Sequence, residues 1–445
     1  MSKLKIAVIG SGISGLACAW LLSKRHNVTL FEREDRLGGH SNTVKVTTPD
    51  GPVGIDTGFI VYNEVTYPNL TAFFAHLDVE TARSNMSFGV SLDAGGYEYS
   101  GSGLGGLFGQ PANLVNPRHY AMLYDMLRFF KTAAKLDANA CDPGLTLAEW
   151  LNQSGYSEDF AQRHILPMGA AIWSVPAAQM MDFPIVAFAR FFQNHGLLKI
   201  RNRPKWRTVV NGSRNYIAKI IADFSGTVRM GFDVQQLTRR DSGVDVLANN
   251  GVVERFDHCV LATHADQALN MLGDADPIER GHLEAFQYSG NEAVLHTDES
   301  IMLKRRRLWS SWNYVSSNPA ENPTVTYWMN SLQPLPTKQN YFVTLNPSAP
   351  IADNHVAGRY HYMHPMFNAA AIAKQKHLWS LQGRCRLWFA GSYFGYGFHE
   401  DGLQAGLAVA ETLGGVTRPW QVEAQSDRLH FDEDGEPNTI MDAAQ

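Results

Sequence analysis

One stretch, residues 5–39, constrains the fold more than any other part of the chain. A short β-branched apolar run at 6–9 leads into Gly10-Ser11-Gly12-Ile13-Ser14-Gly15, and residues 16–25 have the apolar spacing of a helix. Residues 28–31 then read as a second buried strand. The order strand, glycine turn, helix and strand is typical of a Rossmann-type dinucleotide-binding unit.

The glycines and one acid in this stretch each have a mechanical role. Gly10 permits the tight turn, Gly12 lets a pyrophosphate approach the backbone, and Gly15 lets the helix lie close to its strand. The second strand ends at Glu32, about 20 residues after the first glycine, where an acid binds ribose. The pattern predicts phosphates at the helix N-terminus, with Ser11, Ile13 and Ser14 beside them.

Two other interpretations fit this stretch less well. A glycine-rich turn in an unrelated α/β protein gives no reason for a carboxylate at the ribose position. A signal peptide would explain Lys3 and Lys5 before an apolar stretch, but glycines and serines interrupt that stretch. Gly15 also occupies the position at which a lipoprotein cleavage site has a large aliphatic residue. We therefore keep the dinucleotide site.

The composition excludes several classes of protein. The 445 residues allow two or three domains, and the formal net charge of −5 predicts no nucleic-acid partner. Cys18, Cys141, Cys259 and Cys385 are far apart, so we expect no metal site and no disulfide framework. The sequence has no apolar run of about 18 residues that would predict a membrane span. A cytoplasmic location fits these features.

The residues after Glu32 indicate the cofactor. The chain continues Arg33-Glu34-Asp35-Arg36-Leu37-Gly38-Gly39-His40, which contains R-x-G-G. It resembles in this respect the flavin amine oxidase and phytoene desaturase superfamily, where R-x-G-G adds contacts to the pyrophosphate of an extended FAD. The resemblance assigns Arg33, Arg36, Leu37, Gly38, Gly39 and His40 to the FAD site. It also implies that Thr57, Gly58 and Phe59, after a hairpin, return the chain to the flavin.

The middle of the chain, residues 67–203, reads as mostly helical. Residues 67–76 and 119–135 have apolar residues at helical spacing, whereas residues 95–109 hold seven glycines and predict a loop or mobile lid. Methionine and aromatic residues are frequent between 164 and 192. Such a stripe is more often core than pocket lining, but its abundance in an inserted domain suggests an apolar ligand cavity.

The remaining segments complete an α/β fold. Residues 205–214 resemble the segment by which the superfamily re-enters its FAD domain, with Asn211 in place of the first glycine, and Val234 matches the residue that pairs with adenine. Residues 285–348 alternate polar and apolar and predict a sheet. We expect a Rossmann-type, glutathione reductase-like FAD-binding domain (1–66, 204–284 and 380–420). A discontinuous α+β substrate-binding domain (67–203 and 285–379) and an acidic tail (421–445) complete the prediction.

Residues 386–413 predict the second half of the FAD site. A strand ends at Gly391 and Ser392, and a helix of small residues begins with Gly402 and Leu403. By the same resemblance, this helix directs its N-terminus at the flavin N1 and C2 carbonyl, where reduction places negative charge. Family members usually have Glu or Asp at Ser392. No cysteine stands in a convincing position for a covalent bond, so we expect noncovalent FAD.

The segment before that helix holds the candidate acid–base residues. Tyr-Phe-Gly-Tyr-Gly-Phe-His399-Glu400 should lie near the flavin, and either His399 or Glu400 is a candidate for moving a proton. The alternative is that the aromatic residues only pack and His399 binds backbone. His361 and His364 are weaker candidates, and Asp401 reads as an N-cap.

Three other segments resemble one bacterial branch of the superfamily: Ala-Ala-Ile-Trp-Ser174, Asn194-His-Gly-Leu-Leu198 and Tyr-Trp-Met-Asn330. Genes of this branch, labelled as predicted FAD-binding proteins, commonly occur beside cyclopropane fatty acid synthase-like methyltransferases. The resemblance implies hydride removal from a C–H of an apolar substrate, a long-chain (modified) fatty acyl lipid, by a desaturase or oxidase with a methyltransferase as partner. The alternatives are a flavin amine oxidase that produces hydrogen peroxide and a non-catalytic lipid-binding or escort protein, as Rab GDP-dissociation inhibitors are.

A basic run adds one expectation about location. Lys304, Arg305, Arg306 and Arg307 are consecutive. The simple interpretation is a solvated turn. The sharper one is a peripheral contact with the anionic lipids of the inner membrane, worth about 1 kcal/mol per basic residue near the surface.

Overall fold

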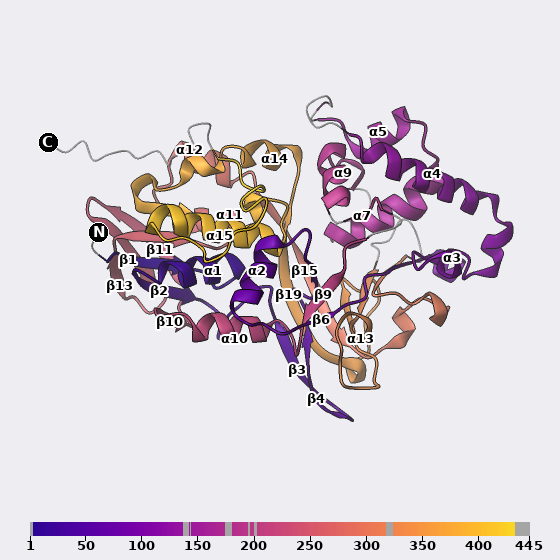
Figure 1. The fold of residues 1–445 in the computed structure, drawn as a ribbon, viewed down its shortest axis with the longest axis horizontal. Helices are drawn as coiled ribbons and strands as arrows, with labels where there is room; N and C mark the ends of the chain where they lie inside the picture. The colour runs from indigo at the N-terminus through magenta and orange to yellow at the C-terminus, as the bar shows by residue number, and fades with distance from the viewer. Residues whose placement is uncertain are drawn as a thin grey trace.

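The computed structural model of the chain describes residues 3–136, 142, 144–173, 180–194, 196–199, 203–316 and 324–431. Ser174 and His195 of the family-like segments, and the acidic residues 432–434, lie outside the described residues. Figure 1 shows two parts side by side, one around β1, α1 and α15 and one around α4, α7 and α9, with long strands between them.

A parallel sheet forms the centre of the first part. Its order is β10 (Thr227–Met230), β2 (Asn27–Glu32), β1 (Lys5–Ile9), β14 (His258–Leu261) and β20 (Leu387–Phe389), and every neighbouring pair is parallel. Strands of a parallel sheet are covered on both faces, and accordingly Ile6, Ala7 and Val8 are fully buried. The predicted α/β class with a Rossmann-type sheet is confirmed.

Two helices of small residues cover this sheet. In α1 (Ile13–Leu22) and α15 (His399–Gly414), glycines make the close contact. A Cβ on Gly406 would lie 2.2 Å from the Ser14 carbonyl oxygen, and one on Gly402 would lie 2.7 Å from Ser14 Oγ. Further elements contribute buried side chains to the hydrophobic core around this sheet. They are the antiparallel strands β11 (Val234–Arg240), β12 (Gly243–Ala248) and β13 (Val253–Phe256), and the helices α10 (Arg214–Ala222), α11 (Ala265–Met271) and α12 (Pro277–Leu283).

The second part is built on a seven-stranded sheet. Its order is β19 (Val356–Met366), β15 (Gln287–His296), β18 (Phe342–Leu345), β17 (Thr324–Trp328), β16 (Trp312–Val315), β7 (Phe88–Leu92) and β8 (Tyr97–Ser100). All pairs are antiparallel except β16 with β7. The predicted sheet of residues 285–348 is present, but it also recruits β7 and β8 from the preceding segment and β19 from the following one.

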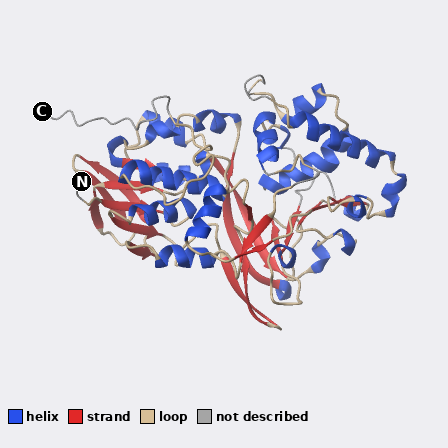
Figure 2. Cartoon of the chain, in the orientation of Figure 1, coloured by secondary structure: helices blue, strands red, loops and turns tan. Residues whose placement is uncertain are grey.

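The helices of this part gather on one side of the sheet, and Figure 2 shows them apart from those around α1. They are α3 (Leu104–Leu107), α4 (Pro117–Ala133), α5 (Leu147–Gln153), α6 (Glu158–Phe160), a π-helical turn (Ala161–Ile165), α7 (Leu166–Trp173) and α9 (Ile185–Asn194). The expectation of a loop over 95–109 was wrong. Tyr97–Ser100 is buried and pairs with β7, and α3 follows, so tertiary pairing overrides the glycines.

Shorter elements complete the two parts. These are the hairpin β3 (Thr43–Thr48) and β4 (Gly51–Asp56), the small sheet of β5 (Tyr62–Asn63), β9 (Trp206–Val209) and β6 (Thr81–Arg83), and the helices α2 (Pro68–His76), α13 (Met329–Leu332) and α14 (Ala369–Gln375). Leu70, Phe73 and Phe74 of α2 lie in the core of the first part, although the sequence placed 67–203 in the other domain. No described helix has the length and apolar character needed to cross a membrane.

Candidate active site

A single large cavity runs between the two parts of the molecule. Its volume is about 1510 Å³, larger than the roughly 300–1,000 Å³ that is usual for a pocket holding one small molecule. One end is lined by the glycine turn after β1, and the other by side chains of α4, α7 and α9. The cavity therefore has room for a dinucleotide and a second ligand.

The glycine turn leaves open space only where a phosphate would need it. Gly10 has a φ of +98°, and a Cβ there would lie 2.6 Å from the Ala262 carbonyl oxygen. A Cβ on Gly15 would lie 1.8 Å from the Gly10 carbonyl oxygen, whereas one on Gly12 would meet no atom within 4 Å. Gly10 and Gly15 thus keep the turn closed, and Gly12 keeps the cradle above the N-terminus of α1 free of side chains.

Glu32 and the R-x-G-G segment complete the nucleotide end. The Glu32 carboxylate accepts hydrogen bonds from Ser11 N (3.0 Å) and Ser11 Oγ (2.5 Å), so it lies directly beside the turn. Arg36 donates to the Gly39 carbonyl oxygen at 2.8 Å. Gly39 has a φ of +56°, and a Cβ there would lie 3.2 Å from the Gly12 Cα. The two glycine segments therefore meet at the cradle.

His399 lies at the junction between the nucleotide end and the rest of the cavity. Its ring stacks on Phe59, with ring centroids 3.7 Å apart and an interplanar angle of 11°. His399 Nε2 lies 2.9 Å from Ser41 Oγ and 3.1 Å from the Tyr216 hydroxyl. Burial lowers the pKa of His399 to about 3, with the nearby His40 adding to the effect. The imidazole is therefore neutral at physiological pH.

Three further histidines line the same region. The His40 ring centroid lies 6.2 Å from that of His264 and 5.6 Å from that of His364. Burial lowers the pKa of His40 and of His264 to about 4, and that of His364 to about 3. This part of the cavity is therefore rich in neutral imidazoles. Among the described residues, no group of histidine, cysteine and acidic side chains has the geometry of a metal site.

Glu400 does not line the cavity. Its carboxylate accepts hydrogen bonds from Asn69 N (3.0 Å), Asn69 Nδ2 (2.8 Å) and Leu70 N (3.0 Å), which are groups at the start of α2. It thus satisfies backbone donors that a helix leaves free at its N-terminus. Burial raises the pKa of Glu400, and Arg428 opposes this rise. The structure gives Glu400 this structural place rather than the expected one beside a substrate.

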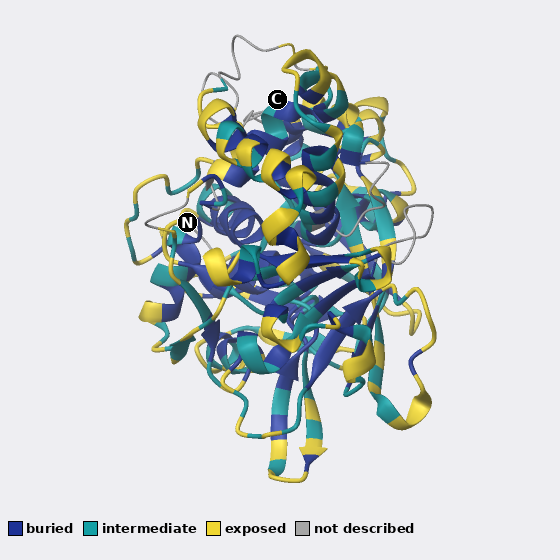
Figure 3. Ribbon diagram, turned by 90° about the vertical axis from the view of Figure 1, so that its right-hand side faces the viewer, coloured by how far each residue is buried: buried dark blue, intermediate teal, exposed yellow. Residues whose placement is uncertain are grey.

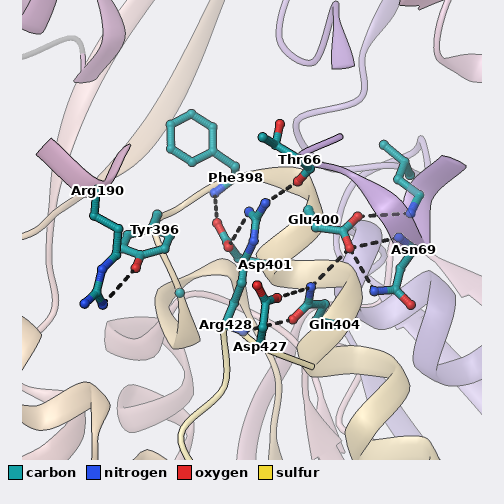
Figure 4. Close-up of polar contacts among 12 residues, drawn as sticks. Thr66, Asn69, Arg190, Tyr396, Phe398, Glu400, Asp401, Gln404, Asp427 and Arg428 are labelled. Atoms are coloured by element: carbon teal, nitrogen blue, oxygen red, sulfur yellow. Dashed lines mark hydrogen bonds and ion pairs between the residues drawn. The ribbon is translucent and has the colours of Figure 1, made fainter. Parts of the chain in front are cut away.

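Asp401, next in the first turn of α15, binds the C-terminal segment (Figure 4). Its carboxylate accepts from Phe398 N at 2.7 Å and pairs with Arg428 at 2.8 Å. Arg428 also donates to the Thr66 carbonyl oxygen. Asp401 therefore caps α15 from its third residue rather than as the predicted N-cap. Arg428 and Leu429 are buried, so the expected acidic tail begins with a docked segment.

The far end of the cavity is an apolar passage. Ten of its apolar lining side chains come from the segment around α3 and from α4, α7 and α9: Leu104, Leu107, Phe108, Leu123, Met126, Leu127, Phe130, Met168, Ile172 and Phe191. Phe191 stacks on Phe398, with ring centroids 4.9 Å apart, where the passage approaches His399. The methionine and aromatic stripe of the sequence thus lies partly in the core and partly on the cavity wall.

Most of the predicted cofactor residues meet in this cavity. The lining includes Gly10, Ser11, Gly12, Ile13, Ser14, Glu32, Arg33, Arg36, Gly38, Gly39, His40, Thr57, Gly58, Phe59, Val234, Gly391 and Ser392. Gly15, Leu37, Gly402 and Leu403 do not line it, and Gly15 and Gly402 instead allow close backbone packing. Sequence reasoning missed His264 and Tyr362. The only signal for His264 was its place at the end of a buried strand, and the only signal for Tyr362 was its place in a segment of alternating polar and apolar residues.

The residues present fit an extended dinucleotide. The open cradle over Gly12 faces an acid at the ribose position, and the cavity continues from there past Val234, Gly39 and Gly391. This fit comes from the geometry of the chain itself, and it agrees with the cofactor that the sequence predicts.

The fold matches those of known flavoenzymes. A CLA-producing fatty acid isomerase from P. acnes is 16% identical, with a TM-score of 0.67 over 91% of this chain and 98% of that one. Putrescine oxidase bound to putrescine is 15% identical (TM-score 0.67; 93% and 99% covered), and cyclohexylamine oxidase from Brevibacterium oxydans IH-35A is 15% identical (TM-score 0.64; 93% and 100% covered). At these identities the likeness shows the fold alone. No curated protein matches the sequence significantly.

The sequence itself shows the family. The family model for flavin-containing amine oxidoreductases matches residues 13–338, which is most of the chain. That match includes Glu32, the R-x-G-G segment and much of the apolar passage. The protein therefore belongs to the flavin-containing amine oxidoreductase family and is a flavin-dependent oxidoreductase.

Proposed function

We propose that this enzyme binds FAD noncovalently and removes a hydride from a C–H bond of a long-chain fatty acyl lipid, as a desaturase or an oxidase. The observation that carries the proposal is the continuity of the cavity. A glycine-lined nucleotide cradle at one end and an apolar passage at the other share one space about His399. An apolar chain in the passage would end beside the cofactor.

The proposed cofactor contacts come from four segments. The backbone at Gly12 would hold the diphosphate, Glu32 the ribose, and Val234 the adenine end, while the N-terminus of α15 would lie toward the flavin ring. None of the cysteines in the described chain lines the cavity, which supports noncovalent binding. When bound, the flavin supplies the hydride acceptor. The role of the protein is then mainly to position the substrate and to exclude water.

The passage suits an acyl chain better than a charged or strongly polar substrate. Its walls are mainly aliphatic, aromatic and methionine side chains, with His164 and Arg203 among them. The apolar side chains gain from burying methylene groups at about 0.8 kcal/mol for each CH₂. Methionine side chains such as Met126 and Met168 adapt to a flexible ligand. A methylated or otherwise modified chain made by a partner methyltransferase is the first substrate to test.

His399 is the residue we assign to proton transfer. Desaturation releases a proton from the carbon next to the one that loses hydride, and the proton needs an acceptor. His399 lines the cavity where the two ends meet, and the Ser41 and Tyr216 hydroxyls lie within hydrogen-bond distance of its Nε2. Oxygen or another acceptor must take up the two electrons to complete the cycle.

Purified protein and lipid test the proposal. The protein should be yellow, release intact FAD on denaturation, and bleach anaerobically with acyl lipids from a methyltransferase reaction. Putrescine and cyclohexylamine serve as amine controls, with hydrogen peroxide measured in air. Bleaching by amines but not by any acyl lipid would favour an amine oxidase and contradict the proposal. Lipid mass spectrometry of cells with and without the gene then identifies the product.

A further inference from the structure

The segment from Leu104 to Leu127 exposes an unusual amount of apolar surface. Six of the thirteen large hydrophobic side chains that are exposed in the described structure fall within these residues: Leu104, Leu114, Val115, Tyr120, Tyr124 and Leu127. We call this set the apolar face. Single exposed hydrophobic residues need no explanation, but a cluster of this kind marks an interaction surface.

The helix α4 is apolar on two sides. Its inner side buries Met122, Phe129 and Phe130 in the core, as expected for a surface helix. Its outer side carries Tyr120 and Tyr124 one turn apart, followed by Leu127, where a surface helix normally has charged residues. Tyr124 is 68% exposed. Figure 3 looks at this end of the molecule and shows exposed turns on the helices that face the viewer.

The cavity reaches the surface at this apolar face. Leu104 is 75% exposed and Leu127 is 44% exposed, yet both also line the cavity. The exposed Ser102 and Gly103 line it beside them. The passage toward His399 therefore begins among the side chains of the apolar face.

Basic residues border the apolar face. Leu308 packs against Gly109 and places the run 304–307 beside α3, while Lys131 and Lys135 follow the outer side of α4. Arg305 pairs with the buried Glu98 at 2.7 Å, so this residue supports the fold. The exposed Arg306 is 3.5 Å from Glu299.

The acids nearby are mostly engaged within the protein. Asp159 pairs with Arg118 and Arg163, and the buried Asp125 with Arg128. Residues 104–135 carry four cationic side chains and one anionic side chain, although the chain as a whole has a net charge of −5. Because Arg118 and Arg128 are engaged by these acids, the exposed Lys131 and Lys135 carry the local charge excess, which favours an anionic partner.

We propose that the apolar face docks on an anionic lipid bilayer, with its bordering cations at the headgroups. Aromatic and aliphatic side chains above a basic rim are what a helix in the membrane interface presents. This inference rests on the proposed function. In the docked protein the passage opens directly into the acyl region of the bilayer, so that a lipid chain enters without crossing water. A second copy of the chain is the competing occupant, but it would cover the mouth of the passage with another cationic surface.

Vesicle sedimentation tests the docking without any turnover. We expect the flavin-loaded protein to bind vesicles of phosphatidylglycerol and phosphatidylcholine, and more weakly those of phosphatidylcholine alone. Val115→Ser with Tyr124→Ser, two exposed positions outside the cavity, should weaken binding by about tenfold or more. The matched control, Val252→Ser with Val253→Ser on the remote hairpin, should bind like the wild type.

Charge and self-association complete the test. Arg306→Gln with Arg307→Gln should lower binding to the anionic vesicles by about fivefold or less per charge and leave binding to phosphatidylcholine unchanged. Absent vesicle binding, or equal losses in the control pair, would overturn the proposal. A wild-type dimer that Val115→Ser with Tyr124→Ser converts to a monomer would assign the face to a second copy instead. Vesicle binding without oxidation of any acyl lipid would contradict the proposed function alone.

Discussion

Replacing Arg428 by methionine should destabilise the protein strongly, because its guanidinium is the buried countercharge for the start of α15. The Arg428 side chain is 7% exposed and that of Asp401 is 0% exposed. Removing one partner of a buried ion pair costs about 3–5 kcal/mol, since the other charge stays buried alone. Here Glu400 is buried beside the same guanidinium, so we expect a free energy of unfolding lower by about 3–5 kcal/mol.

The cost should depend on pH in a definite direction. Burial already raises the pKa of Asp401 and of Glu400, and Arg428 opposes both shifts. In Arg428→Met the folded-state pKa values rise further above those of the unfolded chain, so the folded state binds more protons. Stability then falls as pH rises through that window. The variant should therefore lose more stability relative to wild type at pH 8 than at pH 5.

Urea unfolding at both pH values, followed by fluorescence and circular dichroism together, measures this loss. Arg428→Met with Asp401→Asn should recover part of it, because the lone carboxylate is removed. Arg255→Met is the matched control: the Arg255 side chain is 55% exposed, and its partner Asp245 keeps a second ion pair with Arg240. We expect Arg255→Met to lower the free energy of unfolding by at most about 1 kcal/mol. A loss below about 1 kcal/mol for Arg428→Met, or no recovery in the double variant, would refute the reasoning.

Three other predictions follow from the cavity. Gly12→Val should weaken flavin binding by about tenfold or more with little change in unfolding of the flavin-free protein, because a Cβ at Gly12 meets no atom within 4 Å. Gly15→Val, the comparison, should instead prevent normal folding, which soluble yield and flavin absorbance report. Because burial lowers the pKa of His399 to about 3, the unfolded state binds more protons below about pH 6.5. The free energy of unfolding should fall as pH drops from there toward 3, and His399→Asn should flatten that slope, which unfolding across this range measures. Met126→Trp should narrow the passage and lower kcat/KM for long acyl chains by about tenfold while sparing short ones, and equal effects on both would count against the passage.

Residues whose role depends on the local backbone were predictable from the sequence. Gly10, Gly12, Gly15 and Glu32 lie within one continuous unit of strand, turn, helix and second strand, so their spacing was sufficient evidence. The same holds for the small residues of α15. Asn211 takes a φ of +60°, which explains how it replaces a family glycine, because asparagine tolerates this conformation.

Residues whose partners lie far along the chain were not predictable. Glu400 caps a helix whose backbone donor at Asn69 is 331 positions away, and nothing near it in the sequence signals that contact. Residues 95–109 look like a glycine-rich loop, yet Glu98 is buried against Arg305. The strand β19 was missed because its side chains are mostly half-buried or exposed and no apolar face stands out. Its His364 completes the histidine group only in the folded protein.

The side chains in the first turn of α15 point in different directions, some into the site and some into the rest of the fold. Successive residues of a helix point about 100° apart, so His399 faces the cavity while Glu400 and Asp401 face α2 and the C-terminal segment. The position of His399 is therefore set by contacts that lie outside the cavity. This arrangement gives the two buried carboxylates a structural role: they hold the end of the helix whose first residue, His399, lines the cavity.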